Sequence, residues 1–376
     1  MVTGLSLTTS QLKAFRSQLL HWFEINKRDL PWRLNRDPYR IWISEIMLQQ
    51  TRVAAVIPYF EKFCSAFPDI KTLAQAKESE VLRLWSGLGY YSRARNMQAA
   101  AQQIVRDHHS IFPSTPEKIR ALPGIGTYTT NAILSIAFGE KHAVLDGNVA
   151  RVVTRLAAIH GDVRESSTWT LLQKTAETLL AHESPGNWNQ AMMELGATIC
   201  TPRAPQCLIC PVQKFCRARR LGIQDVIPEK RKKRATVEVL LAAAILTDRA
   251  GRCLLLPPPK PNSRKSTAAD IPTLVSGMWH FPTVAVGKNP AEELRAYLHE
   301  NFIKAKNMPR LEALHKVRHA VTYRAITLLP FRAEFKTLPK IPGAKAVPLK
   351  NFASVPVSNL TRKAAHAALK HPASEK

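Results

Sequence analysis

The chain has 376 residues, 45% of them hydrophobic, which is enough for two domains with a core each. Its 54 Lys and Arg residues against 28 Asp and Glu give a net charge of +26, so a polyanion such as nucleic acid is the favoured partner. No apolar run reaches the ~20 residues of a membrane-spanning helix, and no secretory leader is recognised at the N-terminus. We therefore expect a soluble, cytoplasmic protein that does not bind membranes.

Residues 1–216 have the pattern of an all-α domain. Thr8 and Gln11 fit a capping box at the start of a first helix, and Asp37 before Pro38 marks the start of another. Prolines and glycines separate the later helical patterns, and strand signals are nearly absent. Further helices are expected over 53–66, 78–86, 91–106, 116–121, 127–138, 148–159, 168–181 and 187–198.

The second half of the chain has a different pattern. Residues 217–235 combine many Lys and Arg residues with one proline, which predicts a basic interdomain linker. From 236 to 365, short apolar or β-branched runs predict strands, interrupted by one helix at 290–303, so we expect a smaller α+β domain. Residues 257–274 are predicted to be a flexible insertion, and residues 366–376 a fraying tail.

Four cysteines form a compact motif. Cys200, Cys207, Cys210 and Cys216 have the spacing C-x6-C-x2-C-x5-C, which can hold zinc or an iron–sulfur cluster. Structural zinc usually takes two short C-x2-C pairs, whereas only one such pair occurs here. The spacing resembles the [4Fe–4S] loop of the endonuclease III superfamily of DNA glycosylases.

Residues 122–133 (LPGIGTYTTNAI) predict a tight turn between two helices. Gly124 and Gly126 allow backbone N–H groups to approach a phosphate at the start of the second helix. This pattern resembles a helix–hairpin–helix that grips the DNA backbone. An ordinary helical hairpin is the alternative reading of the same residues.

Two carboxylates are candidates for catalysis. Glu45 lies in residues 41–51 (IWISEIMLQQT), an otherwise apolar helix, where desolvation should raise its pKa and keep it protonated as a general acid requires. Asp146 precedes the helix of residues 144–156 (VLDGNVARVVTRL). From the residues alone, Glu45 could instead satisfy a buried partner, and Asp146 could simply cap its helix.

Six segments in order resemble the adenine DNA glycosylases of the MutY family across nearly all of residues 8–216. They are SEIMLQQT (44–51), GLGYYSRARN (87–96), LPGIG (122–126), LDGNV (145–149), NQAMMELGATIC (189–200) and the cysteine motif. The resemblance implies a monomeric enzyme of base excision repair with a [4Fe–4S] cluster. It would flip adenine mispaired with 8-oxoguanine, or guanine, out of double-stranded DNA and hydrolyse its glycosidic bond.

The resemblance also assigns roles to individual residues. Glu45 would protonate adenine at N7 and help activate water, and Asp146 would stabilise the positive sugar. Tyr128 and Asn148 would orient the sugar and Asp146. The implied DNA contacts are Gln50, Thr51, Leu88 and Tyr90 around the vacated stack, together with the hairpin glycines Gly124 and Gly126.

The chain departs from its relatives at two places. Bifunctional endonuclease III-type enzymes carry a hairpin lysine where this chain has Tyr128, so the resemblance implies a monofunctional enzyme that leaves an abasic site. The C-terminal half resembles the MutT-like (Nudix-fold) domain of the family but lacks a Nudix box, so no pyrophosphatase activity is expected. Where most relatives have Phe-Ser-His to read 8-oxoguanine, this chain has Val321, Thr322 and Tyr323, and only the hydroxyl of Thr322 remains.

Three hypotheses follow. The leading one is an adenine glycosylase directed at A·8-oxoguanine pairs. The second is a bifunctional glycosylase for oxidised pyrimidines, which would form a covalent adduct with DNA through a lysine. The third is a catalytically silent iron–sulfur protein that binds DNA or senses redox state, and that would release no base from any mismatch.

Overall fold

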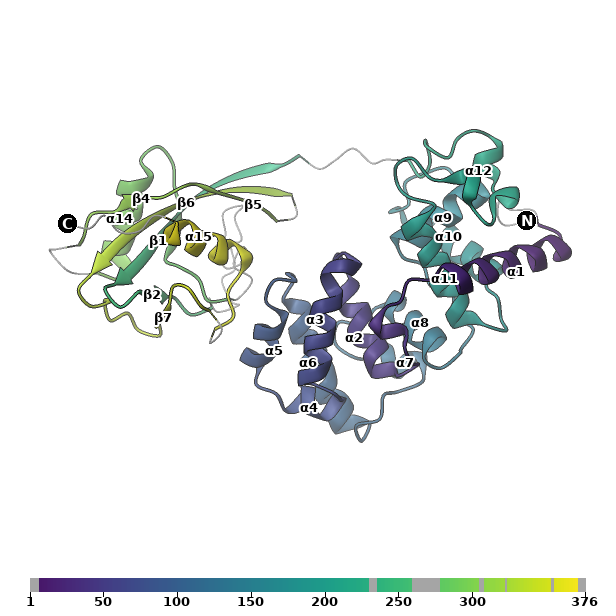
Figure 1. Cartoon of the computed structure of the whole chain (residues 1–376), viewed down its shortest axis with the longest axis horizontal. Helices are drawn as coiled ribbons and strands as arrows, with labels where there is room; N and C mark the ends of the chain where they lie inside the picture. The colour runs from purple at the N-terminus through teal and green to yellow at the C-terminus, as the bar shows by residue number, and fades with distance from the viewer. Residues whose placement is uncertain are drawn as a thin grey trace. The chain divides into compact units, whose positions relative to one another are not determined.

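The computed structural model describes residues 7–229, 235–258, 278–303, 308–321, 323–352 and 355–370. The chain divides into two compact units (Figure 1). The first consists of Met1–Gln75 and Asn96–Lys232, and the second of Ala76–Arg95 and Lys233–Lys376. No helix in the described part of the chain is long and apolar enough to cross a membrane.

The first unit is helical throughout residues 7–75 and 96–229, with no strand among them, as predicted. The Thr8–Gln11 capping box and the Asp37 cap before Pro38 are both present. Its elements are α1 (Thr9–Asn26), η1 (Pro31–Arg33), α2 (Pro38–Leu48), α3 (Val53–Ala66), α4 (Ile70–Gln75), α6 (Ser92–Asp107, which begins in the second unit), α7 (Pro116–Arg120), α8 (Thr127–Ile136), α9 (Gly147–Ala157), α10 (Ser166–Leu179), α11 (Pro185–Thr198), η2 (Cys207–Ile209), η3 (Gln213–Phe215) and α12 (Arg217–Arg220).

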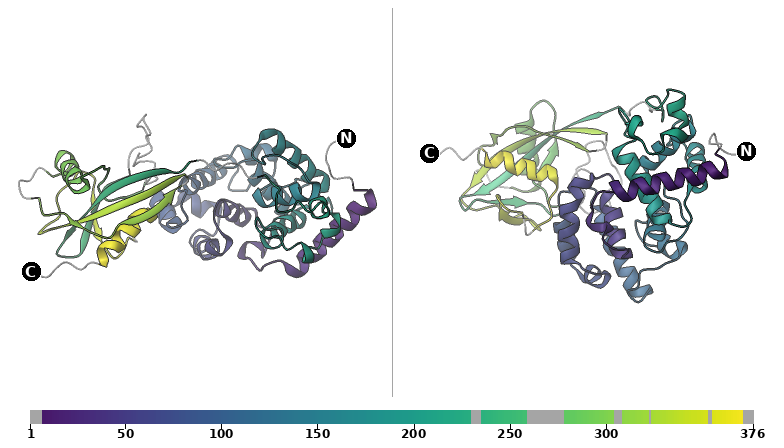
Figure 2. Two further views of the ribbon diagram at one scale, coloured as in Figure 1. Left: turned by 90° about the horizontal axis from the view of Figure 1, so that it is seen from above. Right: turned by 45° about the vertical axis from the view of Figure 1, so that its right-hand side comes forward.

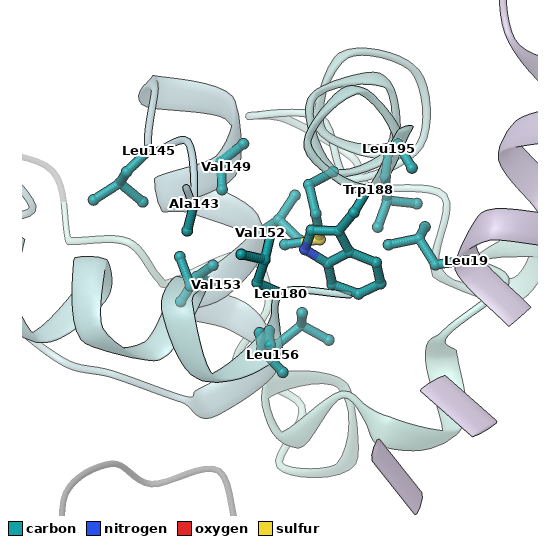
Figure 3. Packing of buried hydrophobic residues seen from close by; sticks show 14 of the residues in the cluster. Leu19, Ala143, Leu145, Val149, Val152, Val153, Leu156, Leu180, Trp188 and Leu195 are labelled. Carbon is teal, nitrogen blue, oxygen red and sulfur yellow. The ribbon is translucent and has the colours of Figure 1, made fainter. Parts of the chain in front are cut away.

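Helix α9 is fixed by a well-packed core. Its valines and leucine recur at i, i+3, i+4 and i+7, so one face is apolar and the opposite face polar. Val149, Val152 and Leu156 are buried in one cluster with Trp188 of α11 and Leu19 of α1 (Figure 3). Because α9 is held on this face, the residues at its N-terminus have a defined position.

The second unit is a mixed sheet with helices on both faces. The strand order is β4-β6-β1-β2-β7, with β3 paired to β1 and β5 to β6, and the central strands β1 and β6 are parallel. The elements are α5 (Glu78–Trp85), β1 (Val237–Asp248), β2 (Arg252–Leu255), β3 (Thr283–Ala285), α14 (Pro290–Asn301), β4 (Glu312–Ala313), β5 (Val317–Val321), β6 (Arg324–Phe335), β7 (Lys345–Pro348) and α15 (Asn359–Leu369).

Strand β1 is apolar on both faces because each face is covered by a helix. Leu241 and its alternate neighbours join a core with Leu360 of α15, whereas Ala242 and its alternate neighbours join a core with Leu294 of α14. Helices α14 and α15 therefore pack on opposite sides of the sheet, and two further views show the same layers (Figure 2).

Three expectations differ from the structure. Residues 1–216 do not form one unit, because Ala76–Arg95 group with Lys233–Lys376. The fraying tail does not begin at residue 366, because α15 continues to Leu369 and buries Ala367 and Ala368. The described part of the predicted basic linker, residues 217–229, belongs to the first unit, since it contains α12 and buries Ala218 and Ile227. Residues 259–274 of the predicted insertion and Thr322 lie outside the described residues.

Candidate active site

A pocket of about 560 Å³ opens in the first unit between α2, α8, α11 and the N-terminus of α9. All four predicted catalytic residues line it, namely Glu45, Tyr128, Asp146 and Asn148. They lie up to 103 positions apart in the sequence and are brought together by the packing of three helices. Such a pocket is large enough for a small ligand or one extruded base.

Glu45 is the buried acid of this pocket. It lies in the middle of α2 and is only 5% exposed, so the prediction that its carboxyl group is desolvated is confirmed. Burial raises the pKa of Glu45 to about 7, and the negative charge of Asp146 acts in the same direction. A hydrogen bond from Tyr128 and the positive charge of Arg33 lower that pKa but do not outweigh burial.

Tyr128 contacts this acid directly. Its hydroxyl donates to Oε2 of Glu45 at 2.6 Å. Burial raises the pKa of Tyr128 well above its ordinary value, and the negative charge of Glu45 adds to that effect, so the phenol keeps its proton. With Oε2 acting as an acceptor, a protonated Glu45 carries its hydrogen on Oε1.

Asp146 is both an N-cap and a member of the pocket. Oδ1 accepts from the backbone N–H of Val149 at 2.7 Å, and Oδ2 accepts from the side-chain amide of Asn148 at 3.0 Å. Burial raises the pKa of Asp146, although these hydrogen bonds lower it. Arg151 holds the other end of the amide by donating to Oδ1 of Asn148 at 2.9 Å.

A buried ion cluster in the pocket was not predicted from the sequence. Glu194 of α11 accepts from Nε of Arg28 at 2.5 Å and from Nη2 of Arg33 at 2.9 Å. Burial alone would raise the pKa of Glu194, but the two arginines outweigh it and hold the pKa below its usual value. Arg33 also donates to the side chain of Gln190 at 3.1 Å. These residues are separated by about 160 positions, so no local sequence pattern indicates the cluster.

The predicted hairpin joins α7 and α8 through two glycines with different surroundings. Gly124 has φ +77°, and a Cβ there would lie 2.7 Å from Cβ of Asn96. At Gly126, a Cβ would meet no heavy atom within 4 Å in the described part of the chain. Gly124 is therefore required by the fold itself, whereas Gly126 leaves room beside the start of α8.

The remaining predicted contact residues are divided between the two units. Gln50 and Thr51 follow α2 at the rim of the pocket, and Gln50 is exposed with φ +56°. Leu88 and Tyr90 lie in the second unit, where Leu88 is 8% and Tyr90 43% exposed. Left-handed backbone at the non-glycine residues Gln50 and Tyr90 is a strained arrangement often found at functional sites.

The four cysteines of the motif line one small cavity beside α9 and α11. None is in a disulfide. In the described residues, no group of three or more Cys, His, Asp or Glu side chains is arranged to hold a single metal ion. Four thiols that are not in disulfides and that line one cavity are able to hold a polynuclear iron–sulfur cluster. Arg155 donates to Sγ of Cys200 at 3.3 Å, and such contacts tune cluster ligands.

The chain is similar to known DNA repair proteins. Residues 43–178 match the family model of the HhH-GPD superfamily of base excision DNA repair proteins. Human adenine DNA glycosylase is 35% identical over 410 residues, which cover 94% of this chain and 74% of the human protein.

Two further relatives each cover more than half of this chain. The adenine DNA glycosylase of Buchnera aphidicola from Acyrthosiphon pisum is 44% identical over 206 residues, covering 54% of this chain and 59% of that protein. The solved structure of a thermostable thymine-DNA glycosylase is 30% identical, with a TM-score of 0.52, and covers 57% of this chain and 100% of that one.

Proposed function

Because the chain belongs to the adenine DNA glycosylases of the helix–hairpin–helix superfamily, we propose that it excises adenine mispaired with 8-oxoguanine or guanine in duplex DNA. The observation that carries this proposal is that two carboxyl groups, those of the buried Glu45 and the partly buried Asp146, line one pocket. Hydrolysis of a glycosidic bond commonly uses two carboxyl groups with different environments.

In the proposed reaction, Glu45 is the general acid. Adenine leaves poorly as an anion, so protonation at N7 by Glu45 makes it a neutral leaving group. A pKa of about 7 keeps a large share of Glu45 protonated near neutral pH, and Tyr128 fixes the orientation of the carboxyl group. After the base leaves, the Glu45 carboxylate can activate the attacking water.

Asp146 is the proposed electrostatic partner of the sugar. As the glycosidic bond breaks, the sugar gains positive charge, which a nearby carboxylate stabilises. Asn148 and the Val149 N–H both bind Asp146, and these contacts favour its anionic form. The adenine reaches this pocket only after extrusion from the stack, which costs a few kcal/mol.

The enzyme is proposed to be monofunctional and to act as a monomer. Tyr128 occupies the hairpin position at which bifunctional relatives carry their lysine nucleophile, so no Schiff base forms there. Gly124, Gly126, Gln50 and Thr51 would contact the DNA near the vacated stack. For 8-oxoguanine, the proposed contacts are Leu88, Tyr90 and Thr322.

The proposed cofactor is a [4Fe–4S] cluster held by Cys200, Cys207, Cys210 and Cys216. When bound, it cross-links the loop from 200 to 216. That loop packs on the same core as α9, because Cys200, Cys210, Cys216 and Phe215 contact the cluster of buried residues that includes Val149. The loop thereby supports α9, the helix that Asp146 caps.

A base-release assay tests the reaction. Adenine should be released from duplexes that carry it opposite 8-oxoguanine or guanine and not from those that carry it opposite thymine. Strand breaks should appear only after alkali.

Glu45→Gln should still bind duplex but lose at least ~10²-fold in release rate, because the proton donor is gone. Undiminished release by this variant contradicts the role of Glu45.

Two other outcomes distinguish the competing functions. A covalent DNA adduct trapped by borohydride would support a bifunctional enzyme. Tight duplex binding without base release from any mismatch would support a silent DNA-binding protein.

A further inference from the structure

The second unit carries a basic groove of about 480 Å³ between β5 and α15. Lys316 and Arg318 line it from the sheet side, and Arg362, Lys363 and Lys370 line it from the helix. Two histidines complete the polar lining, and no carboxylate belongs to it among the described residues. Helix α15 and strand β5 lie side by side in this unit.

The two walls of the groove are held in place by buried residues and by a hydrogen bond between them. Its floor includes the buried Val317 and Ala367, and Lys363 donates to the backbone carbonyl of Arg318 at 3.0 Å, which ties its two walls together. All five cationic side chains belong to exposed residues. Among the ion pairs of the described residues, none involves these five cations, so their charges remain available to an anion.

One end of the groove adjoins the loop that carries Leu88 and Tyr90, inside the same unit. Arg362 donates from Nη2 to the Ser86 hydroxyl at 2.8 Å. Asn359, at the start of α15, donates to the carbonyl of Gly87 at 3.3 Å. Arg362, one of the five cations of the groove, therefore lies next to the loop that carries Leu88 and Tyr90.

We propose that this groove binds the phosphate backbone of duplex DNA next to the mispair. Closely spaced exposed cations on two walls favour a polyanion with regularly repeated charges, and such contacts position DNA without reading its sequence. The identity of the polyanion rests on the proposed function. An acidic protein segment is the rival occupant of the same groove.

The salt dependence of DNA binding tests the proposal. Lys316→Gln/Lys370→Gln removes one cation from each wall, and both side chains belong to exposed residues. Affinity for an undamaged duplex is measured by fluorescence anisotropy between about 50 and 200 mM salt. If both lysines contact phosphates, the slope of log K against log[salt] falls in magnitude by about 1.8.

The matched control is Lys288→Gln/Arg295→Gln, which removes the same charge near α14, on the opposite face of the sheet. This control should leave the slope within about 0.3 of the parent value. A single groove variant, Lys363→Gln, should reduce the magnitude of the slope by about 0.9. Equal slopes for the groove variant and the parent, or equal changes in groove variant and control, overturn the proposal and leave an acidic protein as the occupant.

The measurement also separates this proposal from the reaction. Binding of an undamaged duplex requires no base release, so a protein that fails to excise adenine still gives a valid slope. Thermal melts of each variant, which should match the parent because the substitutions are on the surface, exclude misfolding as the cause.

Discussion

At the scale of single residues, the pocket gives its two carboxyl groups different partners. Glu45 accepts a hydrogen bond from a neutral phenol, whereas Asp146 accepts from a backbone N–H at the start of α9 and from an amide. The helix N-terminus carries partial positive charge, which favours an anion at Asp146. Glu45, in the second half of α2, has no such help, and burial raises its pKa to about 7.

The buried acid should destabilise the fold above neutral pH. The folded-state pKa of Glu45 is about 7 against an ordinary 4.5, so the folded state holds the proton more tightly than the unfolded state. Its contribution to stability is therefore intact below about pH 4.5 and is lost as the pH rises through 7, at a cost of about 3 kcal/mol by pH 8.

Glu45→Gln, which is neutral at every pH, should therefore melt several degrees above the parent at pH 8 and close to it at pH 4.5. Thermal melts of both proteins at the two pH values check this. A melting difference that does not depend on pH would show that the charge of Glu45 is not the cause.

The burial of Glu45 could be predicted from the sequence, because apolar residues surround it within one helix. The ion cluster of Arg28, Arg33 and Glu194 could not. Its members come from separate elements, and a charged residue in a sequence usually indicates an exposed face. The packing of α11 against α1 brings these residues into one pocket.

At the scale of elements, the hairpin between α7 and α8 uses its two glycines for different purposes. Gly124→Ala should destabilise the first unit by more than about 1 kcal/mol, because the new Cβ meets Asn96 and the backbone is left-handed. Gly126→Ala should fold normally, because its φ is −100° and the new Cβ meets no heavy atom of the described residues within 4 Å. The same variant should weaken DNA binding if a phosphate approaches the backbone at this residue.

Thermal melts and duplex affinity, measured for both alanine variants, separate these effects. A Gly126→Ala protein with parental affinity would show that the hairpin does not approach the DNA backbone at that residue. Gly124→Ala serves as the control for a purely structural loss.

Long elements with clear periodicity can be predicted from the sequence to within a few residues at either end, including α3 and α9. Short edge strands and the last helix cannot. Helix α15 buries mostly alanines, which give little hydrophobic contrast, and β4 and β7 have only two and four residues. The structure of these strands depends on pairing with β6 and β2, which local sequence does not record.

At the scale of the whole molecule, the cysteine loop connects the cofactor with the stability of the first unit. Freshly purified protein should be brown, with broad visible absorption and about four irons per chain. Cys207→Ser should lose the colour and lower the melting temperature of the first unit, because the loop is no longer cross-linked. A colourless native protein containing zinc would contradict the proposed cluster.

The second unit is built from two stretches of chain, and this limits how the protein can be cut. Separating the molecule at residues 230–234 would leave Ser86 and Gly87 on one fragment and their partners Asn359 and Arg362 on the other. Each fragment would expose residues that are buried or hydrogen-bonded in the intact chain. We therefore expect neither fragment to fold and bind as the corresponding unit of the intact protein does. Truncated versions for crystallography or directed evolution should keep residues 76–95 covalently joined to the C-terminal sheet, for example by grafting that stretch onto it.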